Sequence, residues 1–214
     1  MLKVKEDKIF ASVLADGAIH IECDEGDEGA KKRDFETSDG KTGVKFEKIY
    51  SEITGVISNI RFQEGNYGVQ LQLTITDGDE KPITLSLGTA SNFGEDMMKK
   101  LMSLDLTQPV TLAPYSFTDE KGKSKKGITV TQNGKKIQNY FYDFAKKEVT
   151  NGYPQPKKGK KPLSKDQWKM YFMEARLFMI DFLTEKLGLE EVKKDQLEDY
   201  GKETEVEADD IPFE

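Results

Sequence analysis

The chain has 214 residues, of which 36% are hydrophobic and 33% charged, and its formal net charge is −7. This length allows one well-buried domain with appendages or two small domains, and the high charge content predicts that part of the chain lies outside any core. We find no apolar leader and no apolar run near the roughly 20 residues that cross a bilayer, and the lone Cys23 excludes an intramolecular disulfide, so we expect a cytoplasmic protein without a membrane partner.

The first predicted element is a β-hairpin over residues 8–23. Two apolar-rich segments, IFASVLA and AIHIEC, flank Asp16-Gly17, a dipeptide favoured in type I′ turns. His20 lies between two isoleucines, and this alternation predicts that it points outward. The stretch 24–43 is polar, rich in glycine and without periodicity, and it predicts a flexible loop.

Residues 49–132 carry the strongest pattern, that of a small β-barrel. Strict alternation of apolar and polar residues predicts strands in the middle of this region. The predicted elements are strands at about 50–62, 69–76 and 83–87, a helix at roughly 91–104, and strands at 110–117 and 127–132. This order is that of an OB-fold, a five-stranded, partly open barrel, although other small β folds share it. We therefore expect a mainly β protein.

The C-terminal third is predicted to add a helix and a tail. Residues 137–149 are aromatic and fit either a strand or a helix. Ser164 opens the later helix with Gln167 as a capping box, and Gly188 ends it. Its apolar stripe fits packing on the barrel or on another subunit, so a homo-oligomer is compatible with the pattern. We divide the chain into an OB-fold domain with its N-terminal hairpin (1–150), a Lys/Pro/Gly linker (151–163), an amphipathic helix (164–188) and a disordered acidic tail (189–214).

Charge is distributed unevenly along the chain. Residues 195–214 hold nine acids and one base, so they sum to −8 and residues 1–194 sum to +1. Within the latter, 118–169 holds fourteen lysines and five acids. A basic body with an acidic tail predicts a protein that binds a polyanion and contacts partners through the tail. A lysine-rich face that serves only solubility is the alternative.

The predicted barrel supplies the residue types that bind single-stranded nucleic acid. In OB-folds, oligonucleotides lie over the second and third strands, near the loops after the first and fourth strands. Here that strand face is polar and uncharged, while both loops combine aromatic rings, on which bases stack, with cations that contact phosphates. Phe62 and Phe117 fit the core equally well, and the direction of Tyr115 stays open. The candidate binding residues are Arg61, Phe62, Tyr67, Gln70, Gln72, Thr84, Tyr115, Phe117, Lys121, Lys123, Lys125, Lys126 and Lys135.

The last residues, ADDIPFE, form the most specific motif. Over about six residues they resemble the acidic tip of bacterial single-stranded DNA-binding proteins, a short Asp run followed by Ile-Pro-Phe. The resemblance implies a phage-type or divergent member of that group, whose tip docks on replication and repair proteins. The family ends on Phe, whereas here Glu214 follows and shifts the terminal carboxylate by one residue. The resemblance implies Phe213 as apolar anchor, Ile211 as second contact, Asp209 and Asp210 as steering groups and Pro212 as a backbone restraint.

The resulting hypothesis is sequence-independent binding and protection of single-stranded DNA in replication, recombination or repair, with the tail recruiting partner proteins. The alternative is a recombination mediator or adaptor that contacts replication proteins through the tail and hardly binds DNA, and a metal-dependent nuclease is a third reading. The sequence has no nucleophile motif or phosphate-binding glycine loop, and His20 with Cys23 is too small a set for zinc. We therefore expect no catalytic residues, no metal and no cofactor.

Overall fold

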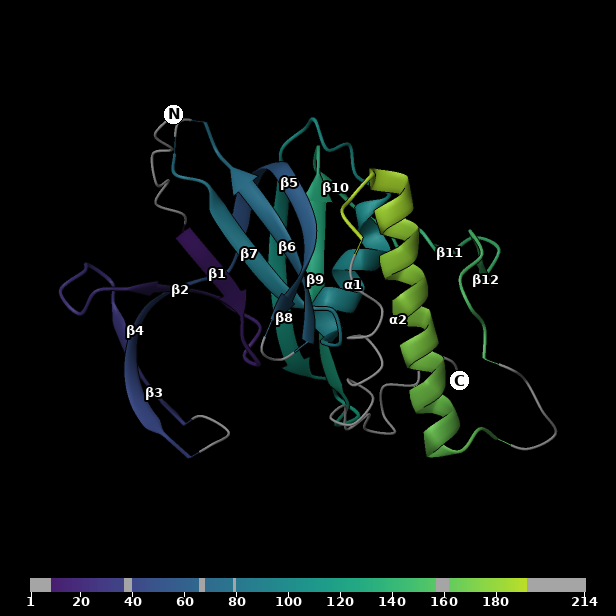
Figure 1. The fold of residues 1–214 in the computed structure, drawn as a ribbon, viewed down its shortest axis with the longest axis horizontal. Helices are drawn as coiled ribbons and strands as arrows, with labels where there is room; N and C mark the ends of the chain where they lie inside the picture. The colour runs from purple at the N-terminus through teal and green to yellow at the C-terminus, as the bar shows by residue number, and fades with distance from the viewer. Residues whose placement is uncertain (1–8, 37–39, 66–67, 79, 157–161, 192–214) are drawn as a thin grey trace.

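The computed structural model describes residues 9–36, 40–65, 68–78, 80–156 and 162–191. This part of the chain is mainly β, as predicted, with one ten-stranded sheet, a two-stranded ribbon and two helices (Figure 1). The sheet strands are β1 (Ile9–Val13), β2 (Ile19–Cys23), β3 (Lys31–Glu36), β4 (Thr42–Tyr50), β5 (Ile53–Gly65), β6 (Gly68–Thr76), β7 (Ile83–Gly88), β8 (Val110–Thr118), β9 (Ser124–Gln132) and β10 (Lys135–Lys136). The ribbon is β11 (Tyr142–Asp143) with β12 (Glu148–Val149), and the helices are α1 (Asn92–Leu101) and α2 (Lys165–Leu187).

The strands of the sheet follow the order β10-β9-β8-β5-β6-β7-β1-β2-β4-β3. β1 runs parallel to β7, and the other pairs are antiparallel. The alternation predicted for β6 and β7 is confirmed, because Leu71, Leu73 and Leu85 are fully buried in the core. The opposite face of these strands carries Gln72 and Thr84, and we call it, with its continuation over β1, β2, β4 and β3, the polar face.

The predicted N-terminal hairpin is confirmed, but its turn is not type I′. A type I′ turn needs positive φ at both central residues, and here Gly17 has a φ of 76° while Asp16 lacks a positive φ. Gly17 N–H donates to the Leu14 oxygen (3.0 Å) and Leu14 N–H to the Ala18 oxygen (3.3 Å), which gives a three-residue loop with glycine in the left-handed position. A Cβ on Gly17 would lie 2.3 Å from the backbone nitrogen of Ser116, so the turn packs directly against β8.

The stretch 24–43 contains an ordered strand, so the prediction of a flexible loop there is wrong. β3 pairs with β4 along its length, from Lys31 opposite Glu47 to Glu36 opposite Thr42. We call these two strands the arm. Figure 1 shows the arm curving away from the rest of the sheet. Apolar–polar alternation did not reveal this strand, because β3 is held mainly by polar contacts with β4 and its inner side is not uniformly apolar.

α1 begins near the predicted residue and closes against one edge of the sheet. The Ser91 hydroxyl accepts the N–H of Gly94 (3.1 Å), as an N-cap does. Asp96 Oδ2 accepts the N–H of Ile128 in β9 (2.8 Å), and Lys100 Nζ donates to the oxygen of the same residue (2.6 Å). β9 pairs with β8 and β10; within the described residues it has no pairing with β7 that would close a barrel.

α2 confirms the predicted C-terminal helix. The Ser164 hydroxyl accepts the N–H of Gln167 (3.3 Å), and Gln167 Oε1 accepts the N–H of Ser164 (2.8 Å), so the capping box is present. At the other end Gly188 adopts a φ of 62°, the left-handed conformation that favours glycine in this position. The helix therefore begins and ends where its sequence signals lie.

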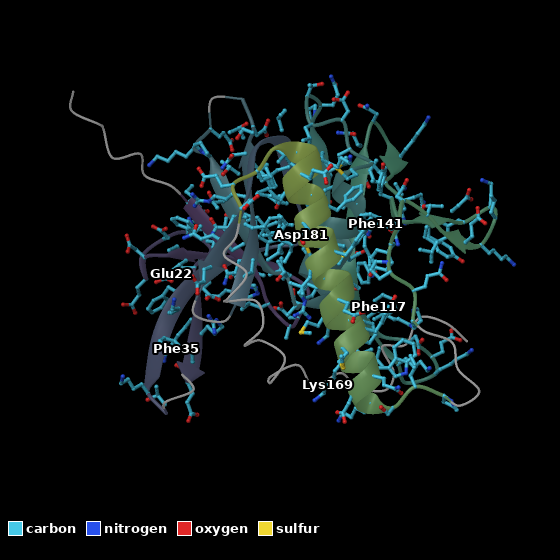
Figure 2. The ribbon with its side chains drawn as sticks, turned by 45° about the vertical axis from the view of Figure 1, so that its right-hand side comes forward. Glu22, Phe35, Phe117, Phe141, Lys169 and Asp181 are labelled. Carbon is cyan, nitrogen blue, oxygen red and sulfur yellow. The ribbon has the colours of Figure 1, made fainter. Side chains whose placement is uncertain are left out.

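The apolar stripe of α2 packs on its own chain. Met179 and Leu183 are fully buried, and Phe178 and Phe182 lie 5.7 and 5.2 Å, between ring centroids, from Phe141 (Figure 2). Phe141 precedes the ribbon β11–β12, so the segment 137–149 is a short hairpin preceded by a buried aromatic residue. Of the two alternatives for that segment, the structure selects strands.

Candidate nucleic-acid interface

The tip of the β8–β9 hairpin presents an exposed aromatic pair beside a lysine. Phe117 is 55% exposed, and its ring centroid lies 5.8 Å from that of the half-buried Tyr115. Lys125 is the cross-strand partner of Phe117, so the two side chains lie on the same side of the hairpin. This arrangement offers a flat apolar surface next to a cation, and it excludes the core placement that the sequence left open for Phe117.

The turn that joins β8 to β9 is ordered by Asp119. Its carboxylate accepts the N–H groups of Lys121 and Lys123 (both 2.9 Å), and its own N–H donates to the Lys123 oxygen (2.9 Å). Both lysine side chains are exposed, as is that of Lys125. The backbone that carries these three charges is therefore fixed, while the charges themselves reach into solvent.

The Tyr115 hydroxyl lies close to Asp96, near the middle of α1. A Cβ on Gly127, its cross-strand partner, would lie 2.6 Å from both the Tyr115 hydroxyl oxygen and Asp96 Oδ2, so only glycine leaves room for this contact. Burial, with a smaller effect of Asp96, raises the pKa of Tyr115 above its ordinary value. The phenol therefore stays neutral near pH 7, and its ring supports Phe117 from one side.

The polar residues of β6 and β7 lie on the side of the sheet opposite the core, as predicted, but they are less exposed to solvent than expected. Gln72 is 8% and Thr84 3% exposed, which corrects the expectation that both are open to a ligand, while Gln70 is half-buried. Arg61 is exposed, and its Nε donates to Gln72 Oε1 (2.9 Å). Arg61 is thus the predicted residue of this face that can reach a phosphate.

The other predicted residues do not gather at the β8–β9 tip. Phe62 is 8% exposed and belongs to the core, which was the alternative reading of its alternation. Lys126 is half-buried on the opposite side of β9 from Lys125. Lys135 is exposed on β10 but pairs with Gln132, about 23 Å along β9 from Lys125 at roughly 3.3 Å per residue.

The two predicted loops also diverge. β5 runs antiparallel to β8, so the β5–β6 tip and the β8–β9 tip leave that pairing in opposite directions. Tyr67 lies outside the described residues, as do all the residues predicted to contact partner proteins: Asp209, Asp210, Ile211, Pro212 and Phe213.

A buried charged cluster ties the arm to the sheet. His20 lies on the polar face, as its alternation predicted, but it is only 5% exposed: Nδ1 lies 2.9 Å from Glu47 Oε2 and Nε2 lies 3.0 Å from Asp16 Oδ2. Arg33 donates to both oxygens of Glu47, from Nε (2.8 Å) and from a terminal nitrogen (2.6 Å). The Arg33 hydrogen bond, against the opposing effect of burial, holds the pKa of Glu47 below its usual range.

Sequence reasoning did not single out Phe10 or Phe35. Phe10 is 56% exposed and pairs with Thr84, so it lies on the polar face. Phe35 lies on the same face of the arm as Arg33, and a Cβ on Gly43 would lie 2.5 Å from its ring, so the ring rests on the bare glycine. The signal for Phe10 was present in IFASV, where it alternates with small or apolar inward residues.

Within the described part of the chain, no group of three or more His, Cys, Asp or Glu side chains could hold a metal ion. Neither α1 nor α2 is both long and apolar enough to cross a membrane. We compared the chain with protein families, with curated proteins and with solved structures, and none of the three comparisons found a match.

Proposed function

We propose that this protein binds single-stranded DNA without sequence preference, through an OB-type barrel formed by β5, β6, β7, α1, β8 and β9, in replication, recombination or repair. The acidic tail recruits partner proteins through Ile211, Pro212 and Phe213, and the site uses neither catalysis nor a cofactor. The assignment to the cytoplasm belongs to the same proposal.

The β8–β9 tip carries the proposal. The exposed ring of Phe117 contacts the ring of Tyr115, and Lys125 is the cross-strand partner of Phe117. The adjoining turn carries the exposed side chains of Lys121 and Lys123. Binding that ignores base identity needs rings for stacking next to cations that contact the backbone, because every base has a flat face and every nucleotide a phosphate. The strand–strand–strand–helix–strand–strand order of residues 53–132 supports the OB-type assignment.

The test is the affinity for labelled oligo-dT, measured by fluorescence anisotropy over a range of salt concentrations. The wild type should bind with an affinity that falls steeply as salt rises, since each phosphate contact releases a counterion. Phe117→Ala should weaken binding roughly 5- to 150-fold, because one stacked base contributes about 1–3 kcal/mol. Phe144→Ala is the matched control, because that ring is 59% exposed on the turn between β11 and β12.

A wild type that binds oligo-dT weakly and without salt dependence would contradict the proposal and favour the adaptor alternative. If Phe117→Ala and Phe144→Ala lose the same affinity for oligo-dT, base stacking at the β8–β9 tip does not explain the binding. Digestion of the oligonucleotide in the presence of magnesium or manganese would instead favour the nuclease reading.

A further inference from the structure

The polar face continues without a break from the centre of the sheet to the arm. Successive cross-strand partners place Gln72 beside Ser86, then Ser12, His20 and Ile49 on one side of the sheet. The line crosses β6, β7, β1, β2 and β4. Cross-strand partners share a face, and so do residues separated by an even number of positions along one strand. Such residues on these strands therefore belong to the same surface.

Large apolar side chains interrupt this otherwise polar surface. Phe10 is 56% and Ile49 40% exposed, and Phe35 is half-buried over Gly43. Single exposed apolar residues are ordinary on proteins, but here two rings and an aliphatic side chain share one face with hydroxyl and amide groups. Such a face suits a ligand with flat apolar parts and many hydrogen-bonding groups.

Cations lie toward both ends of the face: Arg61 is three strands from Phe10, and Lys31 is four residues along β3 from Phe35. Arg61 lies at the β5 side, and on the arm Lys31 and Lys45 have the same parity as Phe35. Lys45 Nζ is 5.7 Å from the Phe35 ring centroid and also contacts Glu22 (2.6 Å). Arg61 and Lys31 form no ion pair with any described residue, so their charge is available to a phosphate.

The arm is held in place, so these groups are presented in a fixed geometry. Arg33 and His20 both bond to Glu47, which joins β3, β2 and β4, and Asp16 extends the cluster to the turn after β1. That turn packs on Ser116, between the aromatic residues of the β8–β9 tip. A rigid surface loses less entropy when it binds a flexible strand.

We propose that the polar face, from Arg61 on β5 across β6, β7, β1, β2 and β4 to β3, is a second contact surface for single-stranded DNA, with Phe10 and Phe35 as base-stacking platforms and Arg61 and Lys31 as phosphate contacts. This inference rests on the proposed function and extends the DNA path away from the β8–β9 tip. Aromatic rings that share a face with Arg61 and Lys31, neither of which forms an ion pair with a described residue, favour a nucleic acid over a second copy of the chain, for which charged groups would be a cost.

The experiment compares full-length variants in oligo-dT binding. Phe10→Ala should weaken affinity roughly 5- to 150-fold, and Phe10→Tyr should bind like the wild type because the ring remains. Phe144→Ala, with nearly the same exposure, should bind as the wild type does. In a plot of the logarithm of the binding constant against the logarithm of salt concentration, Lys31→Ala should make the negative slope shallower by about 0.7, the contribution of one phosphate contact. Its control is Lys32→Ala, since Lys32 is exposed on the opposite face of the same strand.

Wild-type affinity in Phe10→Ala, with the expected loss in Phe117→Ala, would overturn the second surface and leave the proposed function standing. Absence of binding by the wild type would overturn both. If Phe10→Ala alters folding, Phe10→Leu keeps the apolar volume without a ring, and wild-type affinity in that variant would likewise overturn the inference. Sedimentation of Phe10→Ala should match the wild type; a smaller particle would identify the face as an interface between copies instead.

Discussion

At the scale of single residues, Glu47 has the largest structural consequence for the arm. It is 5% exposed and accepts hydrogen bonds from strands that are distant in sequence. The sequence did not predict that His20 and Arg33 are hydrogen-bonded to Glu47, because Glu47 lies 27 and 14 residues away from them along the chain. Periodicity reports which side of a strand a residue occupies, but it does not report what covers that side.

Glu47→Gln should lower the free energy of unfolding by about 1–2 kcal/mol at pH 7, because Arg33, whose side chain is 39% exposed and so partly solvated, would lose its carboxylate partner. A carboxyl whose pKa is depressed in the folded state stabilises the fold above its unfolded pKa, about 4.3, and loses that contribution as pH falls through the folded pKa. The difference in unfolding free energy between wild type and variant should therefore narrow as pH falls below that unfolded value. Urea unfolding at several pH values measures it.

Glu22→Gln is the control for that series. Its carboxylate is 64% exposed and contacts Lys45, so the expected cost is below about 1 kcal/mol. A Glu47→Gln cost that stays the same at pH 3 and pH 7 would contradict the role assigned to its charge.

At the scale of elements, the sequence predicted best where one side of a strand or helix is apolar. β6 and β7 alternate strictly, and α2 carries both a capping box and a terminal glycine, so each was located within a few residues. β3 was missed because its sequence, KKRDFE, has no apolar face. The segment 137–149 was ambiguous because its partners, Phe178 and Phe182, lie far along the chain.

The same limit applies to the candidate binding residues. The sequence identified Phe117 and the lysines of the β8–β9 turn because aromatic and basic residues adjoin there. It overestimated access to Thr84, which pairs with Phe10 on the neighbouring strand. That pairing is a parallel contact between strands more than 60 residues apart in number, and no local pattern reports it.

Phe141 should be essential for docking the β11–β12 ribbon and α2 on the sheet. It is 1% exposed and contacts rings from both Tyr153 and α2, so Phe141→Ala should cost about 3–5 kcal/mol of unfolding free energy. Phe144→Ala, three residues on and 59% exposed, should change it by no more than about 0.5 kcal/mol. Urea titration monitored by circular dichroism compares the two, and equal stabilities would contradict this packing.

At the scale of the whole molecule, charge separation along the chain predicts that the tail competes with DNA for the proposed binding site. Residues 195–214 sum to −8, whereas 118–169 is rich in lysine. Deletion of 195–214 should therefore strengthen oligo-dT binding, most at low salt, where the screening length is longest. Anisotropy titrations of the two proteins at several salt concentrations measure this.

Replacing Ile211, Pro212 and Phe213 with alanine keeps the tail charge and serves as the control. That variant should bind DNA as the wild type does, while losing affinity for partner proteins. Unchanged or weaker DNA binding after the deletion would refute competition by the tail.

The hydrogen bonds from Asp96 and Lys100 of α1 to the backbone of Ile128 in β9 affect the tendency of the protein to aggregate at high concentration. Asp96 and Lys100 occupy both the N–H and the carbonyl of Ile128, the groups that an incoming strand would need. An edge strand with free backbone groups invites pairing with other chains and, through it, aggregation. Since the backbone groups of Ile128 are already hydrogen-bonded by side chains, another chain cannot extend the sheet at this position, which lowers the tendency to aggregate through that edge.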